Sequence, residues 1–256
     1  MLVSYDLSQI ELRVAALLSG DIALVNAYVH NADLHTDRTV HLFGDDFLRE
    51  KYGEGYRKHP GFRALERQLG KTINFADLYR AGWKRIKATA MEKLGLNLSD
   101  HFCQNIERSR PVVRPGLWDW QESWIDSVRK TNRLELPIFG QSRFFEGDVG
   151  FHINEIVNFP VQATAANFMS CVQIEVHRQL DPMEIATPNR AVHLTANVYD
   201  ALYFDVADSH LPRLDRIFQS AIHSVTTNGY WADLQRLTGN VVPVAYERST
   251  HDHPST

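Results

Sequence analysis

Apolar and polar positions alternate along the chain with two different periods, which predict helices interspersed with a few strands. The apolar run LVSY at residues 2–5 predicts a buried strand. The residues from Ser8 to Leu18 predict a helix with Ser8 near its N-cap. Residues 21–60 predict short helices and loops. Residues 61–94 predict mainly helix, interrupted at the RAG tripeptide.

The second half of the chain predicts longer helices and two pairs of strands. The segment GLNLSD at residues 95–100 opens a helical region, and residues 117–133 have the spacing of an amphipathic helix. Residues 134–148 predict a hairpin with turn residues at FGQS. A long buried helix is expected after Pro160. Residues 194–206 predict two strands joined by a tight turn at YDA.

Composition is that of an ordinary globular protein, with 44 % hydrophobic and 23 % charged residues among 256. The two cysteines, Cys103 and Cys171, provide no disulfide framework, which favours a reducing, cytoplasmic compartment. No apolar stretch approaches the roughly 20 residues of a membrane span. The final segment STHDHPST is expected to fray. The formal net charge is -4, so nucleic-acid binding would have to come from a local basic patch.

A basic segment between Arg57 and Lys87 provides such a patch. It contains nine basic residues against two acidic ones, a local balance of +7. Charge alone is more typical of a solvated helix face. The spacing of the basic and aromatic residues within the segment therefore distinguishes a solvated face from a binding surface.

One stripe of this segment combines cations with aromatic rings. Its members recur every four residues, and they are Arg67, Lys71, Phe75 and Tyr79. Another side of the same helix is apolar, with Leu65, Leu69, Ile73 and Ala76. The apolar side can pack on the core and leave the stripe accessible. Cations suit a polyphosphate, and an aromatic ring suits the flat face of a base.

Two aspartates at strand ends suggest a metal site. Asp6 follows the first strand, and Asp200 lies at the turn within residues 194–206. A turn aspartate ordinarily caps its own backbone. If the strands lie side by side, however, the two carboxylates meet, and like charges that close are unfavourable without a cation between them. Oxygen ligands with open positions suit Mg²⁺, and two ions about 4 Å apart can serve phosphoryl transfer.

Three short segments occur in the order, and at about the separations, of the motifs of a known protein family. They are DLSQIELR at residues 6–13, RQLGKTINFADLY at residues 67–79 and VYDA at residues 198–201. They resemble motifs A, B and C of the family A, or DNA polymerase I-like, DNA polymerases, whose forms are DYSQIELR, Arg-x3-Lys-x3-Phe-x3-Tyr and VHDE. NADLHTDRTVHLFG and NFPVQATAANF are similar to two further segments of the family. The resemblance covers essentially the whole chain.

The resemblance implies an α/β (α+β) fold. A palm with an antiparallel sheet would carry two metal-binding aspartates, and mostly helical fingers would hold the nucleotide. The implied palm covers residues 1–35 and 151–256, and the implied fingers cover residues 36–150. The thumb and exonuclease domains that precede motif A in the family would be absent, since five residues precede Asp6.

The resemblance also implies site residues. Asp6, Asp200 and the backbone oxygen of Leu7 would bind two Mg²⁺ ions, with Mn²⁺ as a substitute. The nucleotide-binding residues would be Gln9, Glu11, His35, Arg67, Lys71, Phe75 and Tyr79. The DNA-binding residues would be Asn158, Gln162 and Tyr199.

Some of these residues would have further roles. Lys71 would be catalytic by protonating the leaving pyrophosphate, and Glu11 would be a steric gate that excludes a ribose 2′-hydroxyl. Arg13 would support Glu11. His35 would contact the triphosphate, although a helix-cap histidine is the alternative interpretation.

The chain departs from the family pattern at several positions. The second acid of motif C is Ala201, so we expect weaker positioning of the metal or primer terminus before any loss of activity. Arg80 stands where the family has a glycine after the motif B tyrosine. The bend of the fingers helix that the family has there therefore does not follow from the resemblance. Four more residues differ from those of the family. Asn154 replaces an arginine, Ala163 a glycine, Asn167 an aspartate and Tyr199 a histidine.

The sequence thus predicts a template-directed DNA polymerase core that acts on primer-template DNA and deoxynucleoside triphosphates, in a bacterial or phage-infected cell. It is expected to be a split or truncated form, with a second polypeptide supplying the missing thumb, or else a minimal enzyme of low processivity. The alternative is a weakly catalytic or non-catalytic module that binds DNA or a partner. A single-subunit RNA polymerase is disfavoured because Glu11 would exclude ribonucleotides.

Overall fold

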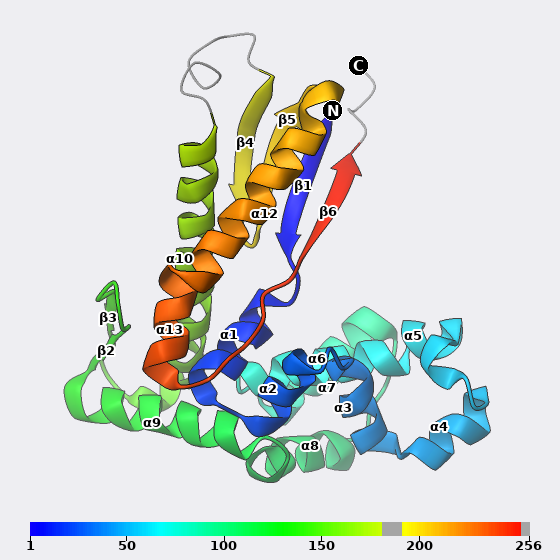
Figure 1. Cartoon of the computed structure of the whole chain (residues 1–256). Helices are drawn as coiled ribbons and strands as arrows, with labels where there is room; N and C mark the ends of the chain where they lie inside the picture. The colour runs from blue at the N-terminus through cyan, green and yellow to red at the C-terminus, as the bar shows by residue number, and fades with distance from the viewer. Residues whose placement is uncertain (181–190, 252–256) are drawn as a thin grey trace. The chain divides into compact units, whose positions relative to one another are not determined.

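The computed structural model describes residues 1–180 and 191–251. These residues form an α+β fold with a four-stranded antiparallel sheet, as the sequence predicted (Figure 1). The chain divides into two compact units. Unit 1 comprises Met1–Leu17, Leu136–Gly140 and Pro160–Thr256, and unit 2 comprises Leu18–Glu135 and Gln141–Phe159.

The sheet of unit 1 has the strand order β4-β5-β1-β6, and all neighbours are antiparallel. Its strands are β1 (Leu2–Leu7), β4 (Val192–Val198), β5 (Ala201–Val206) and β6 (Tyr246–His251). Unit 1 also contains most of α1 (Ile10–Ser19) and α10 (Ile153–Gln179), with η3 (Asp208–His210), α12 (Leu211–Thr227) and α13 (Tyr230–Thr238).

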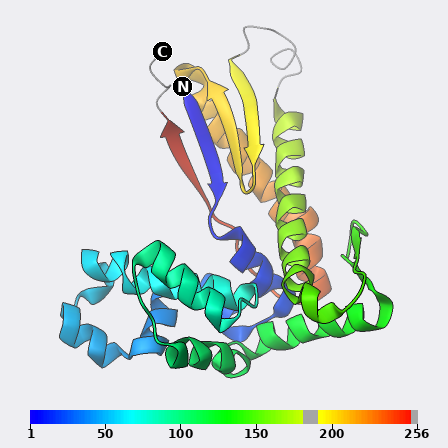
Figure 2. The same ribbon diagram turned by 180° about the vertical axis from the view of Figure 1, so that it is seen from behind.

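Helix α12 covers one face of this sheet, as the views from front and back show (Figures 1 and 2). The ring of Tyr5 on β1 stacks on Phe218 of α12 with centroids 4.2 Å apart, and it meets Phe204 of β5 edge-on. Val3, Tyr5 and Leu7 are all fully buried. Because alternate residues of a strand point to opposite faces, Asp6 projects from the other face of the sheet.

Unit 2 is mostly helical. Its elements are α2 (Ile22–Val29), α3 (Leu34–Phe43), α4 (Asp45–Tyr52), η1 (Tyr56–Lys58), α5 (Pro60–Ala64), α6 (Glu66–Leu78), α7 (Trp83–Leu94), α8 (Asp100–Val113), α9 (Pro115–Thr131), β2 (Arg133–Glu135), β3 (Ser142–Phe144) and η2 (Val149–His152). The predicted hairpin is present as β2 and β3. The predicted apolar side of α6 is buried with α7 and α8, through Leu69, Ile73 and Ala76.

Helix α3 lies directly against α6. Thr39 donates a hydrogen bond to Glu66 O at 3.0 Å. A Cβ atom at Gly70 would lie 2.3 Å from His35 O, so only glycine permits this approach of the two helices. Residues Leu34 and His35 therefore belong to the same compact unit as α6, and the palm and fingers boundaries expected at 35/36 and 150/151 stay a prediction.

Three predicted element boundaries are wrong. Helix α1 begins at Ile10 because Gln9 adopts a left-handed conformation with φ 56°. Helix α10 begins at Ile153 and continues through Pro160, which removes one backbone donor without ending the helix. The expected frayed tail is in part the strand β6, because it pairs with β1 as far as His251. The rest of that tail lies outside the described residues.

Side chains fix the end of α6, where the family's glycine is absent. Arg80 takes φ 51°, so the chain still bends there, with a side chain in the left-handed region. Its guanidinium lies 3.7 Å from the Trp118 ring centroid and donates to Gln121 and Glu122. Gln121 in turn donates to Leu78 O at 2.8 Å, which satisfies a carbonyl that the helix end leaves open.

We predict that Arg80→Gly lowers the free energy of unfolding by about 1–2 kcal/mol. Glycine removes about 1 kcal/mol of left-handed strain. The buried cation–π contact and charged hydrogen bonds that are lost outweigh that gain. Urea denaturation measures the difference. Asn132→Gly is the matched control, because Asn132 also has φ 53° but is exposed, so it should be neutral or stabilising. A stabilised Arg80→Gly protein would contradict the account.

Candidate active site

The strand pairing of unit 1 brings Asp6 and Asp200 together. Asp6 lies opposite Ala201 in the β1–β5 ladder, and Leu7 N–H donates to Asp200 O at 2.9 Å. Asp200 therefore occupies the turn immediately before β5, beside the strand that carries Asp6. Partial burial raises the pKa of Asp6, and the negative charges of Asp200 and Glu247 raise it further.

Glu247 is a third carboxylate that the sequence analysis missed. It lies on β6 directly opposite Asp6, so both side chains project from the same face of the sheet. The stretch AYERST has no alternation of apolar and polar residues, and its last two residues belong to the segment that was predicted to fray, so no sequence pattern marked this strand. Among the described residues, no group of three or more His, Cys, Asp or Glu side chains is arranged to hold a metal ion. An ion held by Asp6 and Asp200 would therefore need further ligands of another kind, such as a backbone oxygen.

The other predicted residues near motif A lie around the start of α1. Gln9 is exposed in the link from β1, and Glu11 is half-buried in the first helical turn. Arg13, expected to support Glu11, is buried and donates from Nε to Ser8 O at 2.8 Å and from Nη1 to Pro243 O. Its guanidinium therefore ties the motif A backbone to the segment that precedes β6.

The predicted DNA-binding residues are distributed over both units. Tyr199 is 92 % exposed, with φ 55°, at the β4–β5 turn beside Asp200 in unit 1. Gln162 is exposed on α10, also in unit 1. Asn158 is half-buried on the part of α10 that belongs to unit 2. Of these three residues, Tyr199 lies beside the aspartate pair because it directly precedes Asp200 in the turn.

In unit 2, Arg67 is held by a carboxylate that the sequence did not predict. Its Nε lies 2.7 Å from Asp33 Oδ2, and its Nη2 lies 3.1 Å from Asp33 Oδ1. Asp33 also caps α3 by accepting from His35 N and Thr36 N. Burial alone would raise the pKa of Asp33, but hydrogen bonds from Arg67 and Thr36 hold this pKa at about 2. Asp33 therefore keeps its charge and orients Arg67.

His35 lies in the same cluster, and its ring is not the helix cap. The cap is the Asp33 side chain, whereas His35 Nδ1 lies 3.1 Å from Asn74 Nδ2 and its ring centroid is 6.5 Å from that of Phe75. The residue is 2 % exposed. Burial, followed by the charge of Arg67, lowers the pKa of His35 to about 4. The imidazole is therefore neutral at physiological pH.

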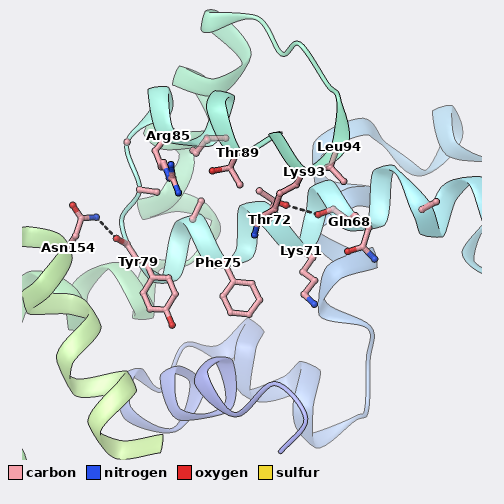
Figure 3. A pocket seen from close by; sticks show the side chains of 15 residues that line it. Gln68, Lys71, Thr72, Phe75, Tyr79, Arg85, Thr89, Lys93, Leu94 and Asn154 are labelled. Atoms are coloured by element: carbon pink, nitrogen blue, oxygen red, sulfur yellow. Dashed lines mark hydrogen bonds between the residues drawn. The ribbon is translucent and has the colours of Figure 1, made fainter. Parts of the chain in front are cut away.

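The predicted stripe on α6 is present. Lys71, Phe75 and Tyr79 project from the same side of the helix (Figure 3). They are among the residues that line a cavity of about 940 Å³, to which Gln68, Arg85 and Lys93 also contribute, so side chains of both α6 and α7 border it. Cationic and aromatic groups of this kind suit a nucleotide or a single nucleic-acid strand.

The sequence model of the protein family called DNA polymerase family A matches residues 1–230. The chain belongs to DNA polymerase family A. It is 26 % identical to the thermostable DNA polymerase I of Thermus filiformis over 91 % of the chain, and 25 % identical to DNA polymerase I of Helicobacter pylori strain J99 over 87 %. It spans 25 % and 22 % of these two relatives, about a quarter of their length.

A solved structure shows the same fold. It is the POL domain of Pol1 from M. smegmatis in complex with DNA primer-template and dNTP. The TM-score is 0.70 with 18 % sequence identity, over 97 % of this chain and 39 % of that one. In the described part of this family A chain, no helix has the length and apolar character needed to cross a membrane.

We predict that Asp6→Asn raises the thermal midpoint of the metal-free protein at pH 7. The pKa of Asp6 is raised in the folded state, so its ionisation opposes folding once the pH exceeds the unfolded value of about 3.9. Below that pH the carboxyl is protonated in both states, so the difference should disappear near pH 3. Calorimetry with a chelator present measures both midpoints.

The matched control is Asp208→Asn, a carboxylate of the same unit whose side chain is 79 % exposed. Its substitution should not raise the midpoint at pH 7. An unchanged or lower midpoint for Asp6→Asn at pH 7 would show that the carboxylate pair carries no electrostatic strain.

Proposed function

We propose that this chain is the catalytic core of a template-directed DNA polymerase that adds deoxynucleotides to a primer 3′-hydroxyl. The observation that carries the proposal is the juxtaposition of Asp6 and Asp200 at the β1–β5 junction. Relatives named DNA polymerase I and a similar fold solved with DNA primer-template and dNTP support it. We also propose that the chain is part of a longer or divided polymerase, whose thumb comes from other sequence.

The donor set fits Mg²⁺. Asp6, Asp200 and the backbone oxygen of Leu7 would supply hard oxygen ligands, and a cation would relieve the like-charge repulsion that raises the pKa of Asp6. When bound, a pair of Mg²⁺ or Mn²⁺ ions makes the primer hydroxyl more acidic and neutralises charge on the triphosphate. The small side chain of Ala201 leaves only Asp200 to act from motif C.

The nucleotide would be held by the cluster on α3 and α6. Arg67, oriented by Asp33, and Lys71 provide cations for the triphosphate, and His35 provides a neutral donor. Lys71 would also protonate the pyrophosphate as it leaves. Phe75 and Tyr79 offer flat faces to sugar and base. Because catalysis of phosphoryl transfer is mainly positioning and charge neutralisation, these groups suffice as the protein's contribution.

DNA would be bound without base-specific readout, since base pairing with the template selects the nucleotide. Asn158 and Gln162 would contact the duplex in its minor groove, and Tyr199 would contact the primer end. Glu11 would fill the space of a ribose 2′-hydroxyl, and Gln9 would contact the nucleotide. We propose that this reaction takes place in the cytoplasm of a bacterial or phage-infected cell. The bacterial relatives support the bacterial host.

The first test is primer extension on a primed template with Mg²⁺ and deoxynucleotides. The wild-type chain should extend the primer, and Asp6→Ala or Asp200→Ala should each reduce the rate at least about 100-fold, because removing a ligand removes transition-state stabilisation. Circular dichroism should show both variants folded. Extension by either variant at the wild-type rate would contradict the assignment. A folded wild-type chain that extends nothing would point to a missing partner chain or to a DNA- or partner-binding role.

The second test concerns sugar selection. Glu11→Ala should lower the ratio of kcat/KM for deoxynucleotides over ribonucleotides at least about tenfold, because the carboxylate no longer fills the 2′-hydroxyl space. Single-nucleotide insertion kinetics measure this ratio. Substitution of the exposed neighbour Gln9 by Ala should change the two substrates alike. An unchanged ratio for Glu11→Ala would remove the gate role.

A further inference from the structure

The orientation of the Asn74 amide is fixed by a group that can only accept a hydrogen bond. Asn74 lies on α6 and is 3 % exposed. Its Nδ2 is 3.2 Å from Leu34 O and 3.1 Å from His35 Nδ1. A backbone carbonyl has no proton to give, so the amide nitrogen, which has two N–H groups, must face it. The second N–H of the same nitrogen is then directed at the His35 ring.

This arrangement determines the protonation of His35. Its Nδ1 receives an N–H, so Nδ1 must carry a lone pair, and the proton of the neutral ring must sit on Nε2. An imidazolium would oppose an N–H to an N–H in a buried site. The charged groups around the ring are Arg67 and Lys71 on α6, which oppose protonation, and Asp33 at the start of α3, which favours it. Burial and the two cations prevail, in agreement with the lowered pKa.

The donor end of the ring is available. Within the described residues, His35 Nε2 makes no hydrogen bond, and neither does Nη1 of Arg67. The close approach of α3 and α6 at Gly70 holds the ring and the amide on facing helices. The cluster thus presents one neutral N–H beside two cations, which is the donor set that an anionic oxygen accepts from.

We propose that Asn74 is a positioning residue that holds His35 as the Nε2–H tautomer, so that the ring donates to a phosphate oxygen of the incoming deoxynucleoside triphosphate. The target of the donor rests on the proposed function, whereas the tautomer does not. With the proton on Nδ1 instead, the Nε2 lone pair would face the phosphate and repel it. Asn74 would therefore act on nucleotide binding without touching the nucleotide.

The tautomer is tested by NMR on protein labelled with ¹⁵N-histidine, using long-range ¹H–¹⁵N correlations. His35→Gln identifies the His35 signals by their loss. The wild-type ring should show a protonated Nε2 and an unprotonated Nδ1 throughout pH 5.5–8.5. Asn74→Asp replaces the donor with an acceptor, so Nδ1 should become protonated. Ile73→Val, a buried control one residue away, should leave the pattern unchanged.

A wild-type ring protonated on Nδ1, or a mixture of tautomers, would overturn the inference whether or not the chain is a polymerase. The proposed function fails separately, through the primer-extension assay. The two outcomes are therefore distinguishable, and the assigned wild-type spectrum decides even if Asn74→Asp does not fold.

The functional arm is a double-substitution cycle in single-nucleotide insertion. Asn74→Leu should raise KM for the deoxynucleotide about tenfold with kcat changed less than threefold. In the His35→Gln background the same substitution should have no further effect, because the ring it orients is absent. An Asn74→Leu effect of equal size in both backgrounds would show a packing role and contradict positioning through His35.

Discussion

The register between β1 and β5 is the constraint on which the candidate active site depends. The ring of Tyr5 stacks on Phe218 of α12, so the apolar side of β1 faces this helix. Asp6 therefore projects from the opposite face of the sheet. A slip of one residue would bury the carboxylate and expose the tyrosine. The same register places Asp200 beside Leu7, and the β1–β6 register places Glu247 opposite Asp6. Hydrophobic packing on one face thus assembles the negative charge on the other.

In α6, too, contacts on one side of the element determine which residues lie on the other side. Its apolar side packs on α7 and α8, and its buried Asp77 pairs with Arg38 and Arg110 at 2.9 Å each. Breaking such a buried pair leaves an uncompensated charge, so this network specifies the rotation of the helix about its axis. With that rotation fixed, Lys71 and Phe75 emerge on the cavity side. Lys71 and Phe75 are therefore positioned by buried charges that lie on another side of the same helix.

Local patterns were sufficient to predict the strand that ends near Asp6, the two strands whose turn carries Asp200, the apolar side of α6 and the stripe of Lys71, Phe75 and Tyr79. Each of these is encoded by periodicity within one element or by a motif. The sequence did not predict the pairing of Asp33 with Arg67 or of Asn74 with His35, since partners 34 and 39 residues apart leave no periodic trace. Glu247 was missed because β6 becomes a strand only by pairing with β1, at the other end of the chain.

Mn²⁺ binding, measured by electron paramagnetic resonance, shows whether Asp6 and Asp200 jointly hold a divalent ion. Titration of Mn²⁺ into the wild-type chain should deplete the free-ion signal, and the deoxynucleoside triphosphate should increase the depletion beyond that of nucleotide alone. Asp6→Asn and Asp200→Asn should each lose most of this binding while Asp208→Asn retains it. Equal Mn²⁺ binding by all four proteins would contradict the account, because the carboxylate pair would then not be the metal site.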